Sequence, residues 1–363
     1  MFNSEFLQLT EEEMIEAGVL DASACVDVIE EAFGLVSKGD YLLGGPSQNE
    51  HGIMIHFPKE TPFEGMPIAG TDRRFMALVA YLGGRFHICG NKWYGSNVAN
   101  KEKGLPRSIH TIMLNDVETG APKCLMCGNL ISAMRTGAVP GVAARYLAPE
   151  GAKTLALIGA GVINRAAVRC IRVGMPDLKV VKVYDIFKDK ANALCQEISR
   201  ELDVEAYATD SMEEAIRDSD VIHFASSGKD KPFIPAEWLK PEALLEISAD
   251  VEYSRDLVYQ SNLVLDQIKM HQAWYDNDKE NHLSSYELMC MLEDGSLKRD
   301  QIMNLGDIVC GMGAGKYRNG KTTMFIANGL PSWDVAWAYQ VYLNAKKKGL
   351  GRNIRLWDTP HWI

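Results

Sequence analysis

The sequence lacks the features that mark membrane, secreted and nucleic-acid-binding proteins. No apolar stretch reaches the roughly 18 residues of a membrane-spanning helix, and the N-terminal segment MFNSEFLQLTEEEM has no basic region followed by an apolar one, as a secretory signal would. Positive charge is scarce, because 38 Lys and Arg residues stand against 48 Asp and Glu residues. We therefore expect a protein of the cytoplasm that binds neither nucleic acid nor membranes.

Cysteine is sparse and scattered, with eight residues in a chain of 363. This distribution is typical of free thiols in a reducing compartment rather than of a disulfide framework. Cys124 and Cys127 form a C-x-x-C pair, but a structural zinc site needs two further ligands, and no second C-x-x-C or H-x-x-H pair follows. We expect two cysteines in a strand and no metal site.

Repeats, low-complexity tracts and long linkers rich in proline or serine are also missing. With 47% apolar and 24% charged residues, the chain is long enough for one large or two ordinary domains. The first part is predicted to contain a short helix opened by a capping box of Thr10 and Glu13, an amphipathic helix over 23–39, and β-hairpins over 76–96 and 108–127.

From about residue 130 the pattern changes to a regular alternation of short apolar strands and helices. The predicted strands are 154–161, 180–185, 205–209, 221–227, 243–250 and 262–267. Such βαβ units predict an α/β protein with a Rossmann-type parallel sheet. Residues 322–351 return to a strand and a long helix, which we expect to pack on the first domain. The predicted division is therefore 1–129, then a nucleotide-binding domain over 130–319, then a C-terminal segment over 320–363.

The segment TLALIGAGVINRAAV carries the features of a dinucleotide-binding turn. Gly159 and Gly161 follow a predicted strand and open a helix at Val162 and Ile163, where backbone N–H groups can approach a pyrophosphate. The next strand ends in Asp185, 26 residues after Gly159. A carboxylate there can accept hydrogen bonds from ribose hydroxyls and would repel a 2′-phosphate, which favours NAD over NADP.

The fingerprint is incomplete, because Asn164 stands where the third glycine is expected. The alternative interpretation is a tight turn in an ordinary α/β domain. Ser226 and Ser227 end the fourth strand, where a sheet of this type opens its ligand crevice, and are predicted to lie near the nicotinamide.

Three charged residues stand in surroundings that suggest a substrate site. Lys92 is flanked by apolar and aromatic residues in GNKWYGSN, and Arg135 is the only charge in a small, apolar helix over about 129–143. Asp250 closes a strand in LLEISAD. Two cations suit carboxylates, and one carboxylate suits acid/base work or amine binding. Each could instead be structural: a lysine whose charge reaches solvent, an arginine with an internal partner, or a carboxylate in a turn.

The motifs KWYGS, ISAMRTGAV, LIGAGVINR, VYD and ISAD, followed by NLGDIVCG and NGLPSWD, resemble the ornithine cyclodeaminase/μ-crystallin family over nearly the whole chain. The segments DRRFMALVAYLGG and MLNDVETG are most similar to the branch that joins two amino acids through a secondary amine, as in N-(2-amino-2-carboxyethyl)-glutamate. The resemblance implies a Rossmann domain plus an α+β domain that binds substrate and builds a homodimer.

The resemblance also implies an activity: an NAD-dependent oxidoreductase that moves a hydride between NAD(H) and the Cα–N bond of an amino acid or its imine. A keto acid is a possible second substrate. One alternative within the family is an ornithine or lysine cyclodeaminase that uses NAD without net redox change. A further alternative, from a different class, is a non-catalytic binder of small ligands like μ-crystallin.

Carried over by residue, the resemblance makes Lys92 a catalytic and substrate-facing cation and Arg135 a clamp for the α-carboxylate. It places Thr136 at the cofactor phosphates and Arg74 on the substrate. Asp250 would act as the acid/base group or hold the distal amine of the substrate. The sequence departs from the family in three places. The segment with Gln48 lacks the basic residue that family members usually carry there. Leu78-Val79 replaces a Met-Pro pair, and Cys127 stands at a position that is frequently acidic.

Overall fold

The computed structural model describes residues 5–227, 231–277, 283–313 and 320–362. The chain divides into two compact units. Unit 1 contains Met1–Asp21, Gly39–Ser132 and Pro331–Ile363, and unit 2 contains Ala22–Lys38 and Ala133–Leu330.

Unit 1 is built mainly from strands. Its elements are β1 (Glu5–Leu9), α1 (Glu11–Glu16), β2 (Tyr41–Leu43), β3 (Ile53–His56), β4 (Arg74–Leu82), β5 (Ile88–Ser96), the 3-10 helix η1 (Val98–Lys103), β6 (Ser108–Asp116), β7 (Pro122–Cys127), α11 (Pro331–Lys348) and β18 (Arg352–Arg355). Helix α3 (Asn129–Leu147) begins in unit 1 and continues into unit 2.

Unit 2 alternates strands and helices. Its other elements are α2 (Ala22–Lys38), β8 (Thr154–Ile158), α4 (Val162–Gly174), β9 (Val180–Tyr184), α5 (Lys188–Leu202), β10 (Glu205–Ala208), α6 (Met212–Ile216), β11 (Val221–Phe224), β12 (Phe233–Ile234), η2 (Ala236–Trp238), β13 (Leu244–Ile247), β14 (Glu252–Tyr253), α7 (Arg255–Gln260), β15 (Asn262–Leu265), α8 (Ile268–Asn277), α9 (Tyr286–Glu293), η3 (Arg299–Gln301), β16 (Ile302–Asn304), α10 (Leu305–Val309) and β17 (Thr323–Ile326).

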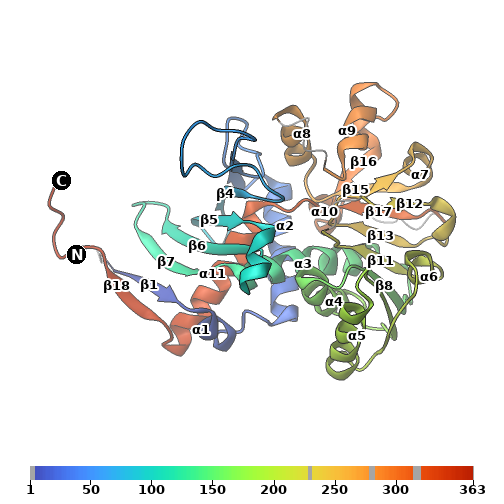
Figure 1. The fold of residues 1–363 in the computed structure, drawn as a ribbon, viewed down its shortest axis with the longest axis horizontal. Coiled ribbons are helices and arrows are strands. Elements are labelled where there is room, and N and C mark those ends of the chain that lie inside the picture. The colour runs from blue at the N-terminus through green and yellow to red at the C-terminus, as the bar shows by residue number, and fades with distance from the viewer. Residues whose placement is uncertain (1–4, 228–230, 278–282, 314–319, 363) are drawn as a thin grey trace. The chain divides into compact units, whose positions relative to one another are not determined.

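The sheet of unit 1 has the strand order β18-β1-β7-β6-β5-β4-β2, with β3 paired to β4. Figure 1 labels the strands from β18 to β4. All of its pairings are antiparallel except β1 with β7. Strands β4 and β5 alternate buried residues with partly or fully exposed ones, as a sheet with one better-covered face requires. Helix α11 packs on β4, β5 and β6 and buries Trp333 and Trp337 completely.

The sheet of unit 2 has the order β10-β9-β8-β11-β13-β17-β15-β16, and every pairing in it is parallel. Its central strands read LALI in β8, VIHF in β11, LLEI in β13 and TMFI in β17, and all of these residues are buried. Side chains are buried on both faces of the sheet, which explains runs that are apolar rather than alternating. The order around β8 reverses between β9 and β11, which is the switch point of a Rossmann-type sheet. The predicted fold class is confirmed.

The structure corrects one expectation about the C-terminal segment. Thr323–Ile326 was expected to return to the first domain, but β17 lies between β13 and β15 in the parallel sheet. All four of its residues are buried, and the pairing with β13 and β15, which these four residues alone do not specify, places the strand in the parallel sheet. Helix α2, expected in the first domain, belongs to unit 2, where it packs on α4 and α10.

No helix among the described residues is both long and apolar enough to cross a membrane.

One charged residue lies inside the parallel sheet without compensation. Glu246 of β13 is fully buried, and neither of its carboxylate oxygens accepts a hydrogen bond from the described residues. Burial therefore raises the pKa of Glu246 well above its usual 4.5, so the carboxyl group holds its proton in the folded protein. Above pH 4.5 the loss of this proton lowers the free energy of the unfolded chain but not that of the folded chain. The residue must therefore lower stability as the pH rises.

We predict that Glu246→Gln flattens this pH dependence. Between pH 5 and pH 8 the stability of the variant should gain roughly 1 kcal/mol or more relative to the wild type, because one proton-linked penalty is removed. Denaturant unfolding at both pH values measures this gain. Glu205→Gln, at an exposed glutamate of β10, is the matched control and should follow the wild type. Parallel curves for the wild type and Glu246→Gln would contradict the prediction.

Candidate active site

The carboxyl edge of the parallel sheet brings together most of the candidate residues of unit 2. Asp185 follows β9, Gly159 follows β8, Ser226 follows β11 and Asp250 lies three residues beyond β13. Because these four strands are neighbours in the order β9-β8-β11-β13, their ends lie in a row at one edge of the sheet. Ser227 and Asp250 are exposed there, and Asp250 makes no side-chain hydrogen bond or ion pair with the described residues.

The two glycines of the turn meet different physical requirements. Gly159 has φ +101°, and a Cβ on it would lie 2.8 Å from the carbonyl oxygen of Ala225. Gly161 has φ −85° and begins α4, yet a Cβ on it would meet no heavy atom within 4 Å. The first glycine is therefore needed by the fold itself, whereas the space beside the second is open.

The open space lies at the start of helix α4. Helix α4 has no side-chain cap, and Val162 is 64% exposed. The first N–H groups of a helix have no partner inside it, and they carry the positive end of the helix dipole. The turn from Gly161 through Val162 and Ile163 thus offers backbone donors to an anion.

Asp185 is held in place by the backbone on both sides of it. Its Oδ2 accepts a hydrogen bond from Ala160 N at 2.7 Å, and its Oδ1 accepts one from Phe187 N at 2.8 Å. The carboxylate therefore stabilises the glycine turn as well as standing at a strand end. The sequence indicated only the second of these features.

Asn164, at the position expected for a third glycine, is fully buried. Its Nδ2 donates to the carbonyls of Ile158 at 3.0 Å and Gly159 at 2.6 Å, so its Oδ1 is left to accept from His223 Nδ1 at 2.7 Å. His223 Nε2 then accepts from Ser248 Oγ at 3.3 Å. Burial lowers the pKa of His223 to about 3, which keeps the ring neutral. The only sequence signal for this network was a histidine inside the apolar strand VIHF.

Helix α3 approaches α4 closely enough for backbones to touch. A Cβ on Gly137 would lie 2.6 Å from Ala167 N, and one on Gly141 would lie 2.7 Å from Cys170 O. Thr136 precedes this contact and is half-buried. The small residues of this helix, already apparent in the sequence, are what allow the close packing.

Arg135 precedes Thr136 on α3 and is 6% exposed. A Cβ on Gly329, which has φ +81°, would clash with its Nη1. The guanidinium therefore lies against the turn that follows β17, whose carboxyl end belongs to the same edge of the sheet as Asp250.

Lys92 of unit 1 is buried and paired rather than directed to solvent. Its Nζ lies 3.0 Å from Asp334 Oδ1 and 3.3 Å from Ser132 Oγ, and the side chains of Lys92 and Asp334 are 3% and 1% exposed. Lys92 Nζ also lies 5.7 Å from the ring centroid of Tyr94. Asp334 was not singled out from the sequence, and its only signal was its place in the NGLPSWD motif.

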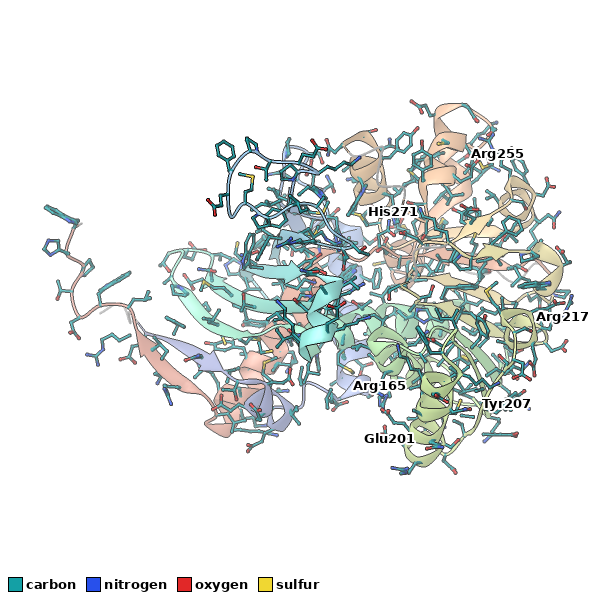
Figure 2. The ribbon with its side chains drawn as sticks, viewed as in Figure 1. Arg165, Glu201, Tyr207, Arg217, Arg255 and His271 are labelled. Atoms are coloured by element: carbon teal, nitrogen blue, oxygen red, sulfur yellow. The ribbon has the colours of Figure 1, made fainter. Side chains whose placement is uncertain are left out.

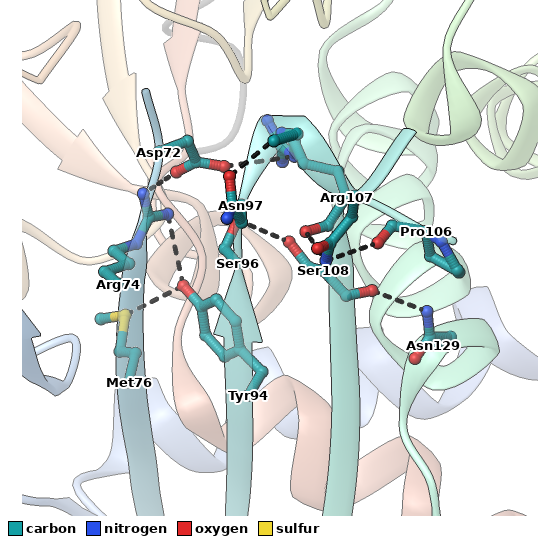
Figure 3. A network of polar contacts seen from close by, with 12 residues as sticks. Asp72, Arg74, Met76, Tyr94, Ser96, Asn97, Pro106, Arg107, Ser108 and Asn129 are labelled. Atoms are coloured by element: carbon teal, nitrogen blue, oxygen red, sulfur yellow. Dashed lines mark hydrogen bonds and ion pairs between the residues drawn. The ribbon is translucent and has the colours of Figure 1, made fainter. Parts of the chain in front are cut away.

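A second group of charges lies around the end of β5 that carries Ser96 (Figure 3). Asp72 contacts both Arg74 and Arg107, with 3.3 Å between Arg107 Nε and Asp72 Oδ2, and it accepts a hydrogen bond from Ser96 Oγ at 2.5 Å. Arg74 Nη2 donates to the hydroxyl of Tyr94 at 3.4 Å. Tyr94 therefore stands between Lys92 and Arg74.

This arginine cluster, formed by Asp72, Arg74 and Arg107, holds two positive charges against one negative charge. The side chains of Arg74 and Arg107 remain 30% and 42% exposed. Partial burial and the nearby charge of Arg74 lower the pKa of Arg107. The cluster is thus a place where a further carboxylate would be stabilised. Arg107 was missed in sequence because its partner Asp72 is distant along the chain.

The two cysteines of the C-x-x-C pair lie in strand β7, three residues apart and hence on opposite faces. Burial raises the pKa of Cys124 to about 12, whereas Cys127 Sγ lies 3.6 Å from Glu11 Oε2. Within the described residues, no three His, Cys, Asp or Glu side chains are grouped so as to hold a metal ion.

Comparison with known proteins adds independent information. The sequence model of the ornithine cyclodeaminase/mu-crystallin family matches residues 19–349. The chain is 25% identical to N-((2S)-2-amino-2-carboxyethyl)-L-glutamate dehydrogenase of Staphylococcus aureus, over 98% of this chain and 100% of that protein. Among solved structures, the Δ1-pyrroline-2-carboxylate reductase of Thermococcus litoralis, in complex with NADH and L-proline, is 26% identical with a TM-score of 0.80, covering 96% and 100% of the two chains. An archaeal alanine dehydrogenase dimer with bound NAD is 25% identical with a TM-score of 0.78, covering 97% and 100%.

The contrast between the two glycines yields a prediction. Gly159→Ala should lower the free energy of unfolding by roughly 2 kcal/mol or more, because it adds a clash to a positive φ. Gly161→Ala should leave it within about 0.5 kcal/mol of the wild type, since its Cβ enters open space. Denaturant unfolding measures both. Equal destabilisation by the two substitutions would show that the fold requires glycine at both positions and would contradict the prediction.

Proposed function

The chain belongs to the ornithine cyclodeaminase/mu-crystallin family, and on that premise we propose that it is an NAD-dependent oxidoreductase acting on the Cα–N bond of an amino acid that carries more than one carboxylate. It moves a hydride between NAD(H) and that bond, as an enzyme that joins two amino acids through a secondary amine would. The NADH-bound and NAD-bound structures similar to this chain support the cofactor, and the relative from S. aureus supports the substrate class.

The residues at the carboxyl edge of unit 2 fit a dinucleotide. The open space at Gly161 and the uncapped start of α4 would take the pyrophosphate, with Val162 and Ile163 supplying N–H donors. Asp185 would accept the ribose hydroxyls. Thr136, Ser226 and Ser227 complete the proposed contacts. When bound, NAD accepts a hydride from the substrate carbon or NADH returns one.

The remaining roles belong to the protein's own charged side chains. We assign Arg135 to the α-carboxylate, which its planar fork can bind in a bidentate way. Asp250, exposed and without a partner among the described residues, would take the proton from the substrate amine and return it. Lys92, held by Asp334, would present a fixed positive charge to the substrate.

The observation that carries the choice of substrate is the arginine cluster. An ornithine or lysine side chain ends in an ammonium group, which would be repelled by two guanidiniums that share a single carboxylate. A carboxylate would instead be attracted to them. Lys92 and Arg74 flank Tyr94 on one face of β5, so unit 1 offers two separated cations. This favours an acidic, secondary-amine substrate over a cyclodeaminase substrate.

We further propose that the protein is a homodimer. Ile53, Ile55, Phe75, Trp93 and Ile109 are large apolar side chains that remain exposed on one face of the unit 1 sheet, opposite Lys92 and Tyr94. The rings of Phe75 and Trp93 stack, with their centroids 5.7 Å apart. An apolar patch of this kind marks an interaction surface, and a second copy of the chain is the occupant favoured by the dimeric archaeal relative. A one-chain molar mass in light scattering would contradict this proposal.

All eight cysteines are free thiols, which supports a location in the reducing cytoplasm.

The role of Asp185 predicts cofactor preference. NADH should bind more tightly than NADPH, and Asp185→Ser should narrow that difference because the repulsion of a 2′-phosphate is removed. The substitution also removes the hydrogen bond from Ala160 N and should therefore weaken the binding of both cofactors. The ratio of the two dissociation constants is therefore the quantity to measure.

The matched control for this ratio is Asp220→Ser. Asp220 accepts from Lys153 N and Thr154 N at 2.7 and 2.8 Å, which is the same kind of backbone support at the opposite edge of the sheet. This variant should keep the wild-type ratio. Tighter binding of NADPH by the wild type would rule out the role given to Asp185.

The proposed function is tested by turnover with NAD⁺ and a panel containing alanine, ornithine and N-(2-amino-2-carboxyethyl)-glutamate, followed by absorbance at 340 nm and mass spectrometry of the products. We expect NADH to form with the acidic secondary amine. Arg107→Gln should raise the KM of that substrate about 10-fold, the scale of a lost charge-assisted hydrogen bond, and leave the KM of alanine, if it is used, within about twofold.

Arg73→Gln is the control, because Arg73 lies 5.4 Å from the Phe57 ring and outside the cluster. Release of ammonia from ornithine without net NADH formation would identify a cyclodeaminase instead. Ligand binding without any turnover would identify a binding protein. Either result would overturn the proposal.

A further inference from the structure

A buried pair of ionisable residues, Asp266 and His271, stands beside the proposed substrate arginine and has no part in the mechanism above. We propose that Asp266 and His271 are positioning residues that hold the Asn328–Gly329 turn against Arg135 and thereby set the orientation of its guanidinium. The inference rests on the proposed function only for what Arg135 binds.

Asp266 follows β15 and is 1% exposed. Its Oδ1 accepts hydrogen bonds from Gln267 N at 2.9 Å and from His271 Nε2 at 2.6 Å, and its Oδ2 accepts one from Gly329 N at 2.7 Å. One carboxylate thus joins the end of β15 to the turn after β17. These two strands are neighbours in the sheet, which brings the groups within reach.

His271 of α8, labelled in Figure 2, gives the same turn a second contact, through Asn328. Its Nδ1 lies 2.7 Å from Ser285 Oγ and 3.0 Å from Asn328 Nδ2. With Nδ1 accepting from these donors, Nε2 carries the proton that is donated to Asp266. The ring is 1% exposed, so its orientation depends on these bonds rather than on water.

Gly329 transmits this support to Arg135. Its φ of +81° is a conformation that other residues rarely adopt, and a Cβ on it would clash with Arg135 Nη1. The guanidinium therefore rests on the bare backbone of the turn. A shift of the turn would change the position of a bidentate fork, whose binding depends on geometry as well as charge.

The energetic cost of the pair argues against a role in core stability alone. Burying a carboxylate costs desolvation energy, and apolar residues of similar volume often stabilise a core at least as well as buried polar groups do. In contrast to Glu246, the Asp266 carboxylate has three donors, which fix its position. A fully satisfied buried network is a means of holding a backbone in one place.

The experiment compares Asp266→Ala, Asp266→Asn and His271→Gln with Tyr253→Phe as the matched control. Tyr253 is a buried residue of unit 2 whose hydroxyl donates to Ser284 O and does not contact the turn. The first readout needs no substrate: hydrogen exchange of residues 326–331, and the rate at which phenylglyoxal modifies Arg135, followed by peptide mass spectrometry. Asp266→Ala and His271→Gln should raise both rates about 10-fold. Asp266→Asn, which keeps an acceptor for Gly329 N, should raise them less.

The second readout is kinetic. For the amino acid with the greatest turnover in the panel, Asp266→Ala and His271→Gln should raise KM about 10-fold while the dissociation constant of NADH changes less than twofold. Tyr253→Phe should lower the melting temperature and change neither readout.

Wild-type exchange and modification rates in Asp266→Ala and His271→Gln would overturn the inference, as would an equal rise in Tyr253→Phe. Unchanged KM in variants whose Arg135 has become reactive would also overturn it. If the wild type turned over no amino acid, the proposed function would fail, and the exchange and modification rates would still decide whether the pair holds the turn and Arg135.

Discussion

The close approach of the chain at Gly159 to the carbonyl of Ala225 is the contact on which the candidate cofactor site depends. A Cβ on residue 159 would lie 2.8 Å from that oxygen, and the residue has a φ of +101°, so glycine is the residue that fits there. The passage lets β8 and β11 end side by side, and it turns the chain into α4 with its first N–H groups uncovered. Asp185 and Asn164 then hold this turn from two sides through backbone groups. Loss of the close approach would displace all of these groups together.

Buried charge is used differently in different parts of the molecule, and the partners show the difference. Lys92 is paired with Asp334, and Asp266 has three donors, so both charges are held in defined positions. Glu246 has no partner among the described residues and stays protonated, so it behaves as a polar defect in an apolar strand. The paired buried charges lie beside the proposed substrate contacts. A site of this kind holds its side chains in fixed positions at a cost in folding stability.

Much of the fold could be predicted because its signals are local. Strands β8 and β9 lie within the predicted ranges 154–161 and 180–185, and the capping box of Thr10 and Glu13 is present. Strand β17 was assigned to the wrong domain, because TMFI is equally compatible with either sheet and only its pairing with β13 and β15 decides. The roles of Asp250, Arg135 and the cofactor-binding residues stay predictions. Asp334 and Arg107 could not have been found, since their partners Lys92 and Asp72 lie far away along the chain.

The sequence by itself determined the alternation of strands and helices, the glycine turn with Asp185 after the next strand, and the family, because each depends on residues close together or on an ordered series of motifs. The tertiary structure decided which charges meet. It buried Lys92 against Asp334, gathered Arg74 and Arg107 around Asp72, and placed Gly329 under Arg135. Those contacts follow from strand order, sheet register and helix packing, and no spacing within a short segment encodes them.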